Sequence, residues 1–103
     1  MQELVQAVMA SRYWNEVAIV ITYDEGGGGW DHVAPPVIDR WGPGTRVPTV
    51  VVSPFAKRGF VDHTTYDSTA ILKLIETRWR LQPLGTRDAA AADMSNAFDF
   101  SRP

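Results

Sequence analysis

The side chains with the clearest chemical potential lie in one short segment of the sequence. In order, this segment contains Asp24, Glu25, four glycines at 26–29, Trp30, Asp31 and His32. Adjacent carboxylates repel each other unless a cation lies between them, and hard divalent cations prefer carboxylate oxygens as ligands. Imidazole extends the range of metals to zinc, manganese and iron. The segment therefore predicts a site for a divalent metal ion, whose identity the ligand types leave open.

A second histidine, His63, lies shortly before the clearest helical pattern of the chain, which begins near Ser68. The N-terminus of a helix carries a partial positive charge and free N–H groups. Such an end suits a phosphate group. This part of the sequence therefore favours a ligand that contains phosphate.

Each of these residues also has a structural interpretation. An acidic pair before glycines is typical of turns. His32 and His63 can be surface residues or hydrogen-bonded structural ones. Trp30 and Trp41 can line a substrate cleft or cover a loop over the core.

Four further polar residues have plain structural interpretations. Asp67 is a candidate helix cap, and Arg46 is a candidate ion-pair partner. Thr22 and Ser53 carry hydroxyls at the ends of predicted strands, but the sequence shows no base paired with either, as a nucleophile would need. We therefore interpret all four as structural.

Two apolar runs predict the strands that position the acidic segment. Residues 17–22 and 47–53 are rich in β-branched side chains without alternation, a pattern typical of strands buried on both faces. Open α/β sheets place ligand sites at the carboxyl ends of their strands, where Asp24 and Glu25 fall. Because a sheet of only two such strands is hard to stabilise alone, we expect an incomplete domain.

Helical spacing of apolar residues predicts the remaining elements. The predicted helices cover residues 2–12, 68–81 and 87–97. We expect Asp67 or Ser68 to cap the second helix and Thr86 to cap the third. The tail at 98–100 alternates, which predicts a short strand or a packed end. The fold class is therefore α/β, with a sheet flanked by helices.

Length and composition exclude several classes of protein. The 103 residues allow one domain at most. A net charge of −2 argues against nucleic-acid binding, which needs a concentrated basic face. No apolar run reaches the roughly 20 residues needed to cross a bilayer. Because the sequence has no cysteine, disulfides and thiolate metal sites are excluded.

Taken in order, the motifs of this chain resemble a known family. After Trp14 they are VAIVITYDEGGGGWDHVAPP, GTRVPTVVVSPFAKRGFVDHTTYDSTAILKLIE, RWRLQPLGTRD and NAFDF. They look like the closing third of bacterial phosphoesterases of the phospholipase C and metal-dependent acid phosphatase type, and the likeness covers about residues 14–100. The resemblance implies that residues 1–103 are the C-terminal segment of a single phosphoesterase catalytic domain. It also implies part of an alkaline-phosphatase-like sandwich, a sheet between helical layers.

The resemblance further implies an activity. Members of this family hydrolyse phosphate mono- or diesters, including phospholipids, at a divalent metal site. Asp24 and Glu25 match the family's acidic pair, which is taken as a set of metal ligands. A metal at such a site neutralises phosphoryl charge and lowers the pKa of the attacking hydroxyl. Because such enzymes are commonly exported, the resemblance implies a secreted or periplasmic location.

The resemblance also implies that the histidines and their neighbours contact the substrate. Asp31 and His32 match the family's Asp-His pair, and His63 matches the histidine of a later Gly-x-Val-x-His segment. The resemblance implies that His32 and His63 are catalytic, as contacts to the phosphate or as proton donors to the leaving group. It also suggests that Trp30 and Asp31 bind the substrate.

One departure from the family pattern limits these expectations. The family's nucleophilic hydroxyl and an early acidic-amide ligand pair lie far upstream of the TYDE motif, whereas only 23 residues precede Asp24 here. They contain no such pair, and Ser11 lies in a helical pattern. We therefore expect a truncated gene product, a fragment of a longer reading frame or a subunit completed by another chain. The expected partner is the missing N-terminal part of the same domain.

Two other functions remain open on this evidence. The chain can be a non-catalytic truncated remnant that at most binds a divalent cation. It can also be a small interaction module whose exposed sheet edge and tryptophans recruit a partner. We expect the isolated chain not to hydrolyse phosphate esters at a useful rate, and the sequence does not separate monoester from diester substrates.

Overall fold

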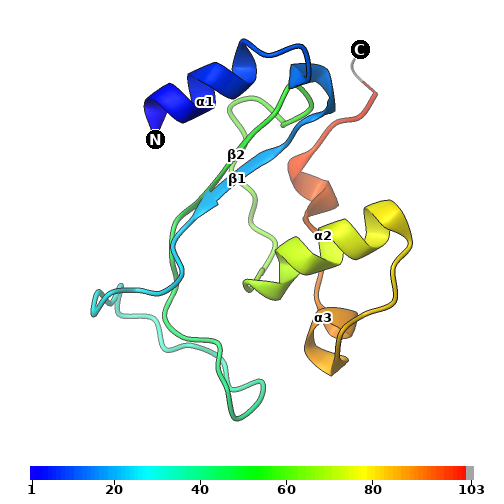
Figure 1. The fold of residues 1–103 in the computed structure, drawn as a ribbon. Helices are drawn as coiled ribbons and strands as arrows, with labels where there is room; N and C mark the ends of the chain where they lie inside the picture. Colours follow the sequence, from blue (N-terminus) through cyan, green and yellow to red (C-terminus); the bar gives the residue numbers. More distant parts are fainter. Residues whose placement is uncertain (102–103) are drawn as a thin grey trace. The chain divides into compact units, whose positions relative to one another are not determined.

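The elements of this chain fall into two units in the computed structural model, which describes residues 1–101 (Figure 1). The units are Met1–Pro54 and Phe55–Pro103, so the last two residues of the predicted segment 1–103 lie outside the described part. The first unit contains the two strands, and the second contains the longest helix. The predicted combination of helices with a small sheet is confirmed.

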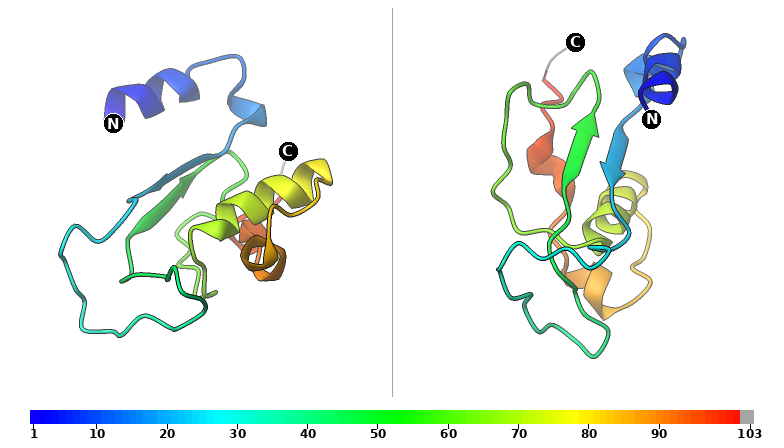
Figure 2. Two further views of the ribbon diagram at one scale, coloured as in Figure 1. Left: turned by 60° about the horizontal axis from the view of Figure 1, so that its bottom comes forward. Right: turned by 90° about the vertical axis from the view of Figure 1, so that its left-hand side faces the viewer.

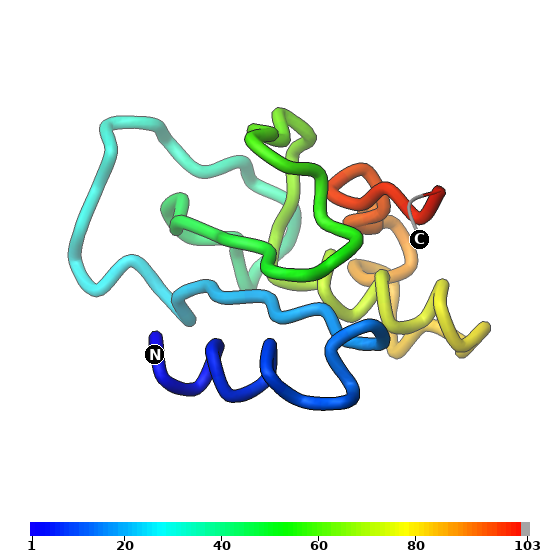
Figure 3. Tube along the Cα trace, turned by 90° about the horizontal axis from the view of Figure 1, so that it is seen from above, coloured from blue at the N-terminus to red at the C-terminus, as the bar shows by residue number. Residues whose placement is uncertain are grey.

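The first unit is built around one pair of antiparallel strands. Its elements are α1 (Gln2–Met9), η1 (Trp14–Glu16), β1 (Ile19–Thr22) and β2 (Thr49–Val52). Ile19 pairs with Val52 and Thr22 pairs with Thr49. Figure 2 shows the strands side by side in opposite directions, and Figure 3 shows residues 23–48 leaving them as a wide loop. This register brings the end of β1 and the start of β2 to the same end of the sheet.

The helix predicted at 2–12 begins as expected but ends at Met9. Both the backbone N–H and the hydroxyl of Ser11 donate to the carbonyl of Val8, the hydroxyl at 2.7 Å. These bonds tighten the chain to an i−3 pattern, which ends an α-helix. The short 3₁₀ turn η1 follows after the predicted helical region and leads into β1.

The prediction that both strands are buried on both faces is wrong. Ile19 to Ile21 are half-buried, and Val50 in β2 is 55% exposed. No side chain of Met1–Pro54 is fully buried. The reason is size, because one two-stranded sheet and one short helix offer too little apolar surface to cover two faces.

The second unit has the buried core of the described chain. Its elements are α2 (Thr69–Trp79), α3 (Thr86–Ala90) and η2 (Met94–Ala97). Ala70, Met94 and Phe98 are its buried apolar residues. Phe98 also forms an isolated bridge with Ala56 and stacks on Phe100, with ring centroids 5.4 Å apart. The tail predicted as a short strand or a packed end is thus a packed end with a single bridge.

The helix predicted at 68–81 is confirmed as α2. Asp67, rather than Ser68, satisfies its start, since its Oδ1 accepts from the backbone N–H of Thr69 at 2.7 Å. The helix ends where Arg80 adopts a left-handed conformation with φ of 55°. That residue stops the helix before Pro83 is reached.

The prediction of a continuous helix at 87–97 is wrong, and so is the prediction that Thr86 caps it. The backbone becomes extended at Ala91, and η2 begins after Asp93, whose carboxylate accepts from the N–H of Ser95. Thr86 lies inside α3 instead of before it. The carboxylate of Asp88 accepts from the backbone N–H groups of Leu84 and Gly85 and so caps the start of α3. The prediction placed the cap on a residue before the helix, whereas Asp88 lies inside it.

No helix among residues 1–101 is long and apolar enough to span a membrane.

Substitution of Asp67 tests which interactions stabilise the second unit. Partial burial acts to raise the pKa of its carboxyl, but hydrogen bonds from Thr69 and Arg87 outweigh burial and hold the pKa below its usual value. The charged form therefore stabilises the fold above the unfolded pKa of about 4, and this stability is lost as the pH falls. We expect Asp67→Ala to lower the free energy of unfolding by about 1–2 kcal/mol at pH 7, measured by urea denaturation.

Asp67→Asn is the matched control, because an amide oxygen can still accept from Thr69 while the charge opposite Arg87 is lost. We expect a smaller loss for this variant than for Asp67→Ala. The difference between the Ala variant and the unchanged protein should shrink at pH 3. An equal difference at pH 3 and pH 7 would contradict the role of the charge.

Candidate functional site

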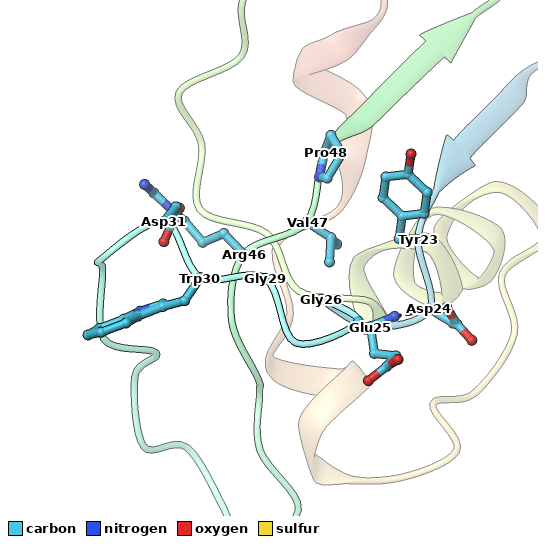
Figure 4. Close-up of a pocket in the computed structure, with 11 residues that line it drawn as sticks. Tyr23, Asp24, Glu25, Gly26, Gly29, Trp30, Asp31, Arg46, Val47 and Pro48 are labelled. Carbon is cyan, nitrogen blue, oxygen red and sulfur yellow. Dashed lines mark hydrogen bonds and ion pairs between the residues drawn. The ribbon is translucent and has the colours of Figure 1, made fainter.

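An open pocket of about 540 Å³ lies in the first unit where β1 ends and β2 begins (Figure 4). Its lining comes from the segment after β1 and the segment before β2: Tyr23, Asp24, Glu25, Gly26, Gly27, Gly29, Trp30, Asp31, Arg46, Val47 and Pro48. The pairing of Thr22 with Thr49 explains why these two segments meet. Four of the predicted site residues, Asp24, Glu25, Trp30 and Asp31, therefore share one pocket.

Glycines form the tight turn that lines part of this pocket. The N–H of Gly29 donates to the carbonyl of Gly26 at 2.8 Å, and Gly27 and Gly28 between them have φ of 56° and 84°. Only glycine adopts such angles without steric cost. A Cβ on Gly26 would lie 2.5 Å from the hydroxyl of Thr45. The turn thus needs glycine both for its backbone angles and for close approach to residue 45.

The acidic pair is exposed at the mouth of the pocket. The Oδ1 atom of Asp24 accepts from the backbone N–H of Glu25 at 3.0 Å. The two carboxylates point in different directions in Figure 4. They are both accessible to a ligand that approaches from solvent.

The donor chemistry of this pair fits a hard cation, but two residues do not make a full set of ligands. Among residues 1–101, no group of three or more His, Cys, Asp or Glu side chains is placed to hold a metal ion. Calcium and magnesium take six or more oxygen ligands, some of them water. Asp24 and Glu25 can therefore supply only part of a metal site, and the rest must come from water or from groups beyond the described chain.

Asp31 and Arg46 form an ion pair on the pocket wall. The Nε atom of Arg46 donates to Oδ2 of Asp31, and the backbone N–H of Val33 donates to Oδ1 at 3.1 Å. The hydrogen bond from Arg46 is the largest cause that holds the pKa of Asp31 below its usual value. The ion-pair interpretation of Arg46 is confirmed. The side chain of Arg46 is still 66% exposed, so it can also meet an anionic ligand in the pocket.

Arg46 and Tyr23 are pocket residues that sequence reasoning did not select as site residues. The only indication in the sequence was the position of each residue next to a predicted strand. Tyr23 directly follows the first predicted strand, and Arg46 directly precedes the second. An antiparallel pairing of these strands would have placed both beside Asp24, but the sequence does not show how two buried runs pair.

Trp30 and His32 form a stacked pair at the edge of the site. Their ring centroids are 5.0 Å apart, and the indole N–H of Trp30 donates to the carbonyl of Val33 at 3.1 Å. Trp30 lines the pocket, whereas His32 does not. His32 also has a left-handed backbone with φ of 64°, a conformation that is uncommon among residues other than glycine. The indole thus lines the pocket and also stacks on the imidazole.

Neither Trp30 nor Trp41 covers a buried core, so that interpretation is wrong for both. Trp41 is 78% exposed, with the guanidinium of Arg40 over its ring at 4.4 Å. Trp30 is 58% exposed. The reason is again that the first unit has no buried core for a loop to cover.

His63 belongs to the second unit, on a loop fixed by its neighbour Asp62. The carboxylate of Asp62 accepts from the N–H of Thr64, the hydroxyl of Tyr66 and the amide of Asn96, at 2.8–2.9 Å. Burial acts to raise the pKa of Asp62, but these hydrogen bonds outweigh it and lower the pKa to about 2. The loop is therefore tied down while the side chain of His63 is exposed.

The two hydroxyls at the strand ends serve the sheet. The Oγ atom of Ser53 donates to the carbonyl of Val17 at 2.9 Å. The Oγ1 atom of Thr22 lies 2.9 Å from that of Thr49 and 3.2 Å from the carbonyl of Pro48. These contacts agree with the structural interpretation of both residues.

Comparisons with known proteins place these features in a family. The model of the Phosphoesterase family matches residues 1–82, so the match begins earlier and ends earlier than the predicted likeness at 14–100. Phospholipase C B of Mycobacterium tuberculosis is 32% identical over 117 residues, and non-hemolytic phospholipase C of Burkholderia pseudomallei is 35% identical over 123 residues. Non-specific phospholipase C6 of Arabidopsis thaliana is 34% identical over 117 residues.

These matches cover most of this chain but little of each relative. They span 87%, 87% and 88% of the chain, and 22%, 18% and 22% of the three relatives in the same order. The chain thus spans about a fifth of the length of the curated relatives it matches. The predicted resemblance to phosphoesterases of the phospholipase C type is confirmed.

The ion pair on the pocket wall can be tested directly. Because the hydrogen bond from Arg46 is the main cause of the low pKa of Asp31, Arg46→Gln should raise that pKa toward the ordinary value of an aspartate. Carbon-detected NMR of the Asp31 carboxyl during a pH titration measures the change. Arg40→Gln, which removes the guanidinium over Trp41 instead, should leave the titration of Asp31 unchanged. Equal effects of the two variants would rule out the assigned pair.

Proposed function

The chain belongs to the phosphoesterase family, and we propose that it forms the C-terminal segment of a catalytic domain that hydrolyses phosphate esters with the help of a divalent metal ion. The observation that carries this proposal is the pocket in which the strand-end acidic pair and the Asp31–Arg46 ion pair face the same space. Clefts at strand ends that combine carboxylates with a cationic group suit a phosphate and its counter-ion.

Asp24 and Glu25 are the metal ligands in this proposal. A bound divalent ion would neutralise phosphoryl charge and lower the pKa of the attacking hydroxyl. The two exposed carboxylates contribute a net charge of −2 to this part of the pocket, which favours a cation over an anion there. The metal itself, whether calcium, iron, manganese or zinc, is left open by this donor set.

Arg46 gives the pocket its anion-binding character. A guanidinium presents planar N–H donors that match phosphate oxygens, and one that already pairs with Asp31 is held in place before the substrate arrives. Asp31 then acts on the substrate through Arg46, as a residue that orients the guanidinium. Trp30 lies beside this pair and provides an apolar wall for the group that carries the phosphate.

His32 and His63 are assigned to contacts with the phosphate or to protonation of the leaving oxygen. The exposed imidazole of His63 on a fixed loop supports this role for His63. For His32, the stacking on Trp30 orients the ring. Because the named relatives are phospholipases C, we infer a phosphate ester or phospholipid substrate, and a phosphate monoester of the acid phosphatase type is the alternative.

The nucleophile in this proposal lies outside the chain, as do the remaining metal ligands. Thr22 and Ser53 use their hydroxyls in strand contacts, which supports this view. The exposed apolar residues of the first unit support it as well, since Val37 is 96% exposed and Val50 lies uncovered in β2. We infer that the N-terminal part of the same catalytic domain covers them and completes an alkaline-phosphatase-like sandwich.

The first test measures hydrolysis. The chain alone should not hydrolyse nitrophenyl phosphate or nitrophenyl phosphorylcholine, with or without metal. Placed in the phospholipase C of Mycobacterium tuberculosis in place of the matching segment, it should support hydrolysis that EDTA abolishes. Asp24→Asn should then lower kcat by about 100-fold or more, since even neighbours of metal ligands cost about 10–100-fold.

Glu16→Gln is the matched control for this experiment, because Glu16 is exposed in the same unit and does not line the pocket. It should leave kcat unchanged. An active chimera that tolerates Asp24→Asn would overturn the assigned role of the acidic pair. Metal-dependent turnover by the unchanged chain alone would show that no other segment is required.

The second test measures metal binding by the chain itself. Mn²⁺ should broaden the backbone NMR signals of Asp24 and Glu25 first. Because the ligand set is incomplete, binding should be weak, with a dissociation constant on the order of 10⁻³ M. The double variant Asp24→Asn, Glu25→Gln should abolish the selective broadening, and Glu3→Gln should not. Broadening that centres on another part of the chain would refute the proposed ligands.

A further inference from the structure

A pair of acidic side chains is buried in the second unit, and neither of them lines the pocket. Glu76 in α2 is 7% exposed, and Asp88 in α3 is 4% exposed. Charged side chains are rarely buried to this extent without a partner of opposite charge. The two carboxyl groups therefore need an explanation in terms of protons, hydrogen bonds or counter-charges.

The two members of the pair differ in their hydrogen bonds. Asp88 accepts from the backbone N–H of Leu84 at 2.6 Å and from that of Gly85 at 2.8 Å. By contrast, neither side-chain oxygen of Glu76 has a hydrogen-bond donor. Two N–H donors favour the charged form of Asp88, whereas a buried carboxylate with no donor is strongly disfavoured.

We propose that Glu76 and Asp88 share one proton, with Glu76 as a neutral acid whose O–H donates to the carboxylate of Asp88. The shared proton forms a latch between α2 and the turn that starts α3. Loss of this proton places two negative charges side by side in a buried site. The latch then opens, because like charges at short range in a poorly solvated site repel each other strongly.

The charged groups around the pair do not replace the proton. Lys73, one turn before Glu76 in α2, donates to the carbonyl of Ala89 at 3.1 Å. Arg87 in α3 pairs with Asp67 at 3.0 Å. On the side of η2, Asp93 accepts from Ser95 and from the hydroxyl of Thr77, and it adds negative charge.

The directions of the two pKa values agree with this geometry. Burial and the neighbouring Asp88 raise the pKa of Glu76, and Lys73 opposes them only in part. For Asp88, burial acts in the raising direction, but the bonds from Glu76, Leu84 and Gly85 outweigh it and lower the pKa. In the folded protein the latch is thus formed between the lowered pKa of Asp88 and the raised pKa of Glu76.

The sign of the effect on stability follows from linkage. A carboxyl whose folded pKa is raised stabilises the protein below its unfolded pKa of about 4.3, and this contribution is lost as the pH rises through the folded pKa. Asp88 has the opposite sign, and its contribution is lost in acid. The second unit should therefore be most stable in mildly acidic solution.

Direct titration of the unchanged chain tests the proposal without any variant. Carbon-detected NMR should show the Glu76 carboxyl titrating above the usual pH range of a glutamate. A Glu76 that titrates at or below the ordinary range would overturn the shared proton.

Substitution gives the second measurement. Glu76→Gln carries a permanent N–H donor to Asp88, so its Tm should stay level between pH 5 and pH 8, while the Tm of the unchanged protein falls. Glu16→Gln should follow the unchanged protein. If Glu76→Gln and the unchanged protein lose Tm equally over this range, the latch does not exist. Glu76→Ala should lower Tm at both pH values, because it removes the donor and leaves a cavity.

Discussion

The candidate site depends on the antiparallel pairing of β1 with β2. Because Thr22 lies opposite Thr49, the segment that leaves β1 and the segment that enters β2 meet at one end of the sheet. This pairing brings Asp24 and Arg46 into the lining of one pocket although 22 positions separate them in the sequence. A shift of the register by one residue would turn every side chain of a strand to the other face and separate the acidic pair from the guanidinium.

The two units differ in how they are held together. All five buried residues of the described chain lie in the second unit, and two of them are the acidic residues Glu76 and Asp88. The first unit carries the pocket but has no buried side chain, so the site is held by backbone pairing, glycine turns and surface ion pairs. Surface ion pairs contribute about 0–1 kcal/mol each. A segment that buries the apolar residues of the first unit would therefore also fix the geometry of the site.

Local patterns in the sequence predicted much of this structure. The α2 helix, both strands and the grouping of Asp24, Glu25, Trp30 and Asp31 followed from periodicity, β-branched runs and short spacing. Burial could not be predicted in the same way, because a β-branched run indicates a strand but does not show how much apolar surface lies against each of its faces. The cap of α3 was missed because the capping residue, Asp88, follows the helix start. The place of Arg46 in the pocket was missed, because its contact with Asp31 depends on the pairing of two distant strands.

The two-stranded sheet also has a consequence for the behaviour of the protein in solution. Within the described residues, each strand pairs with one neighbour only, so each has an edge of backbone N–H and C=O groups that the sheet itself does not satisfy. The strand sequences IVIT and TVVV contain no charged residue or proline, the features that usually discourage the addition of further strands. We therefore expect concentrated solutions of the chain to be prone to cross-β association through these edges.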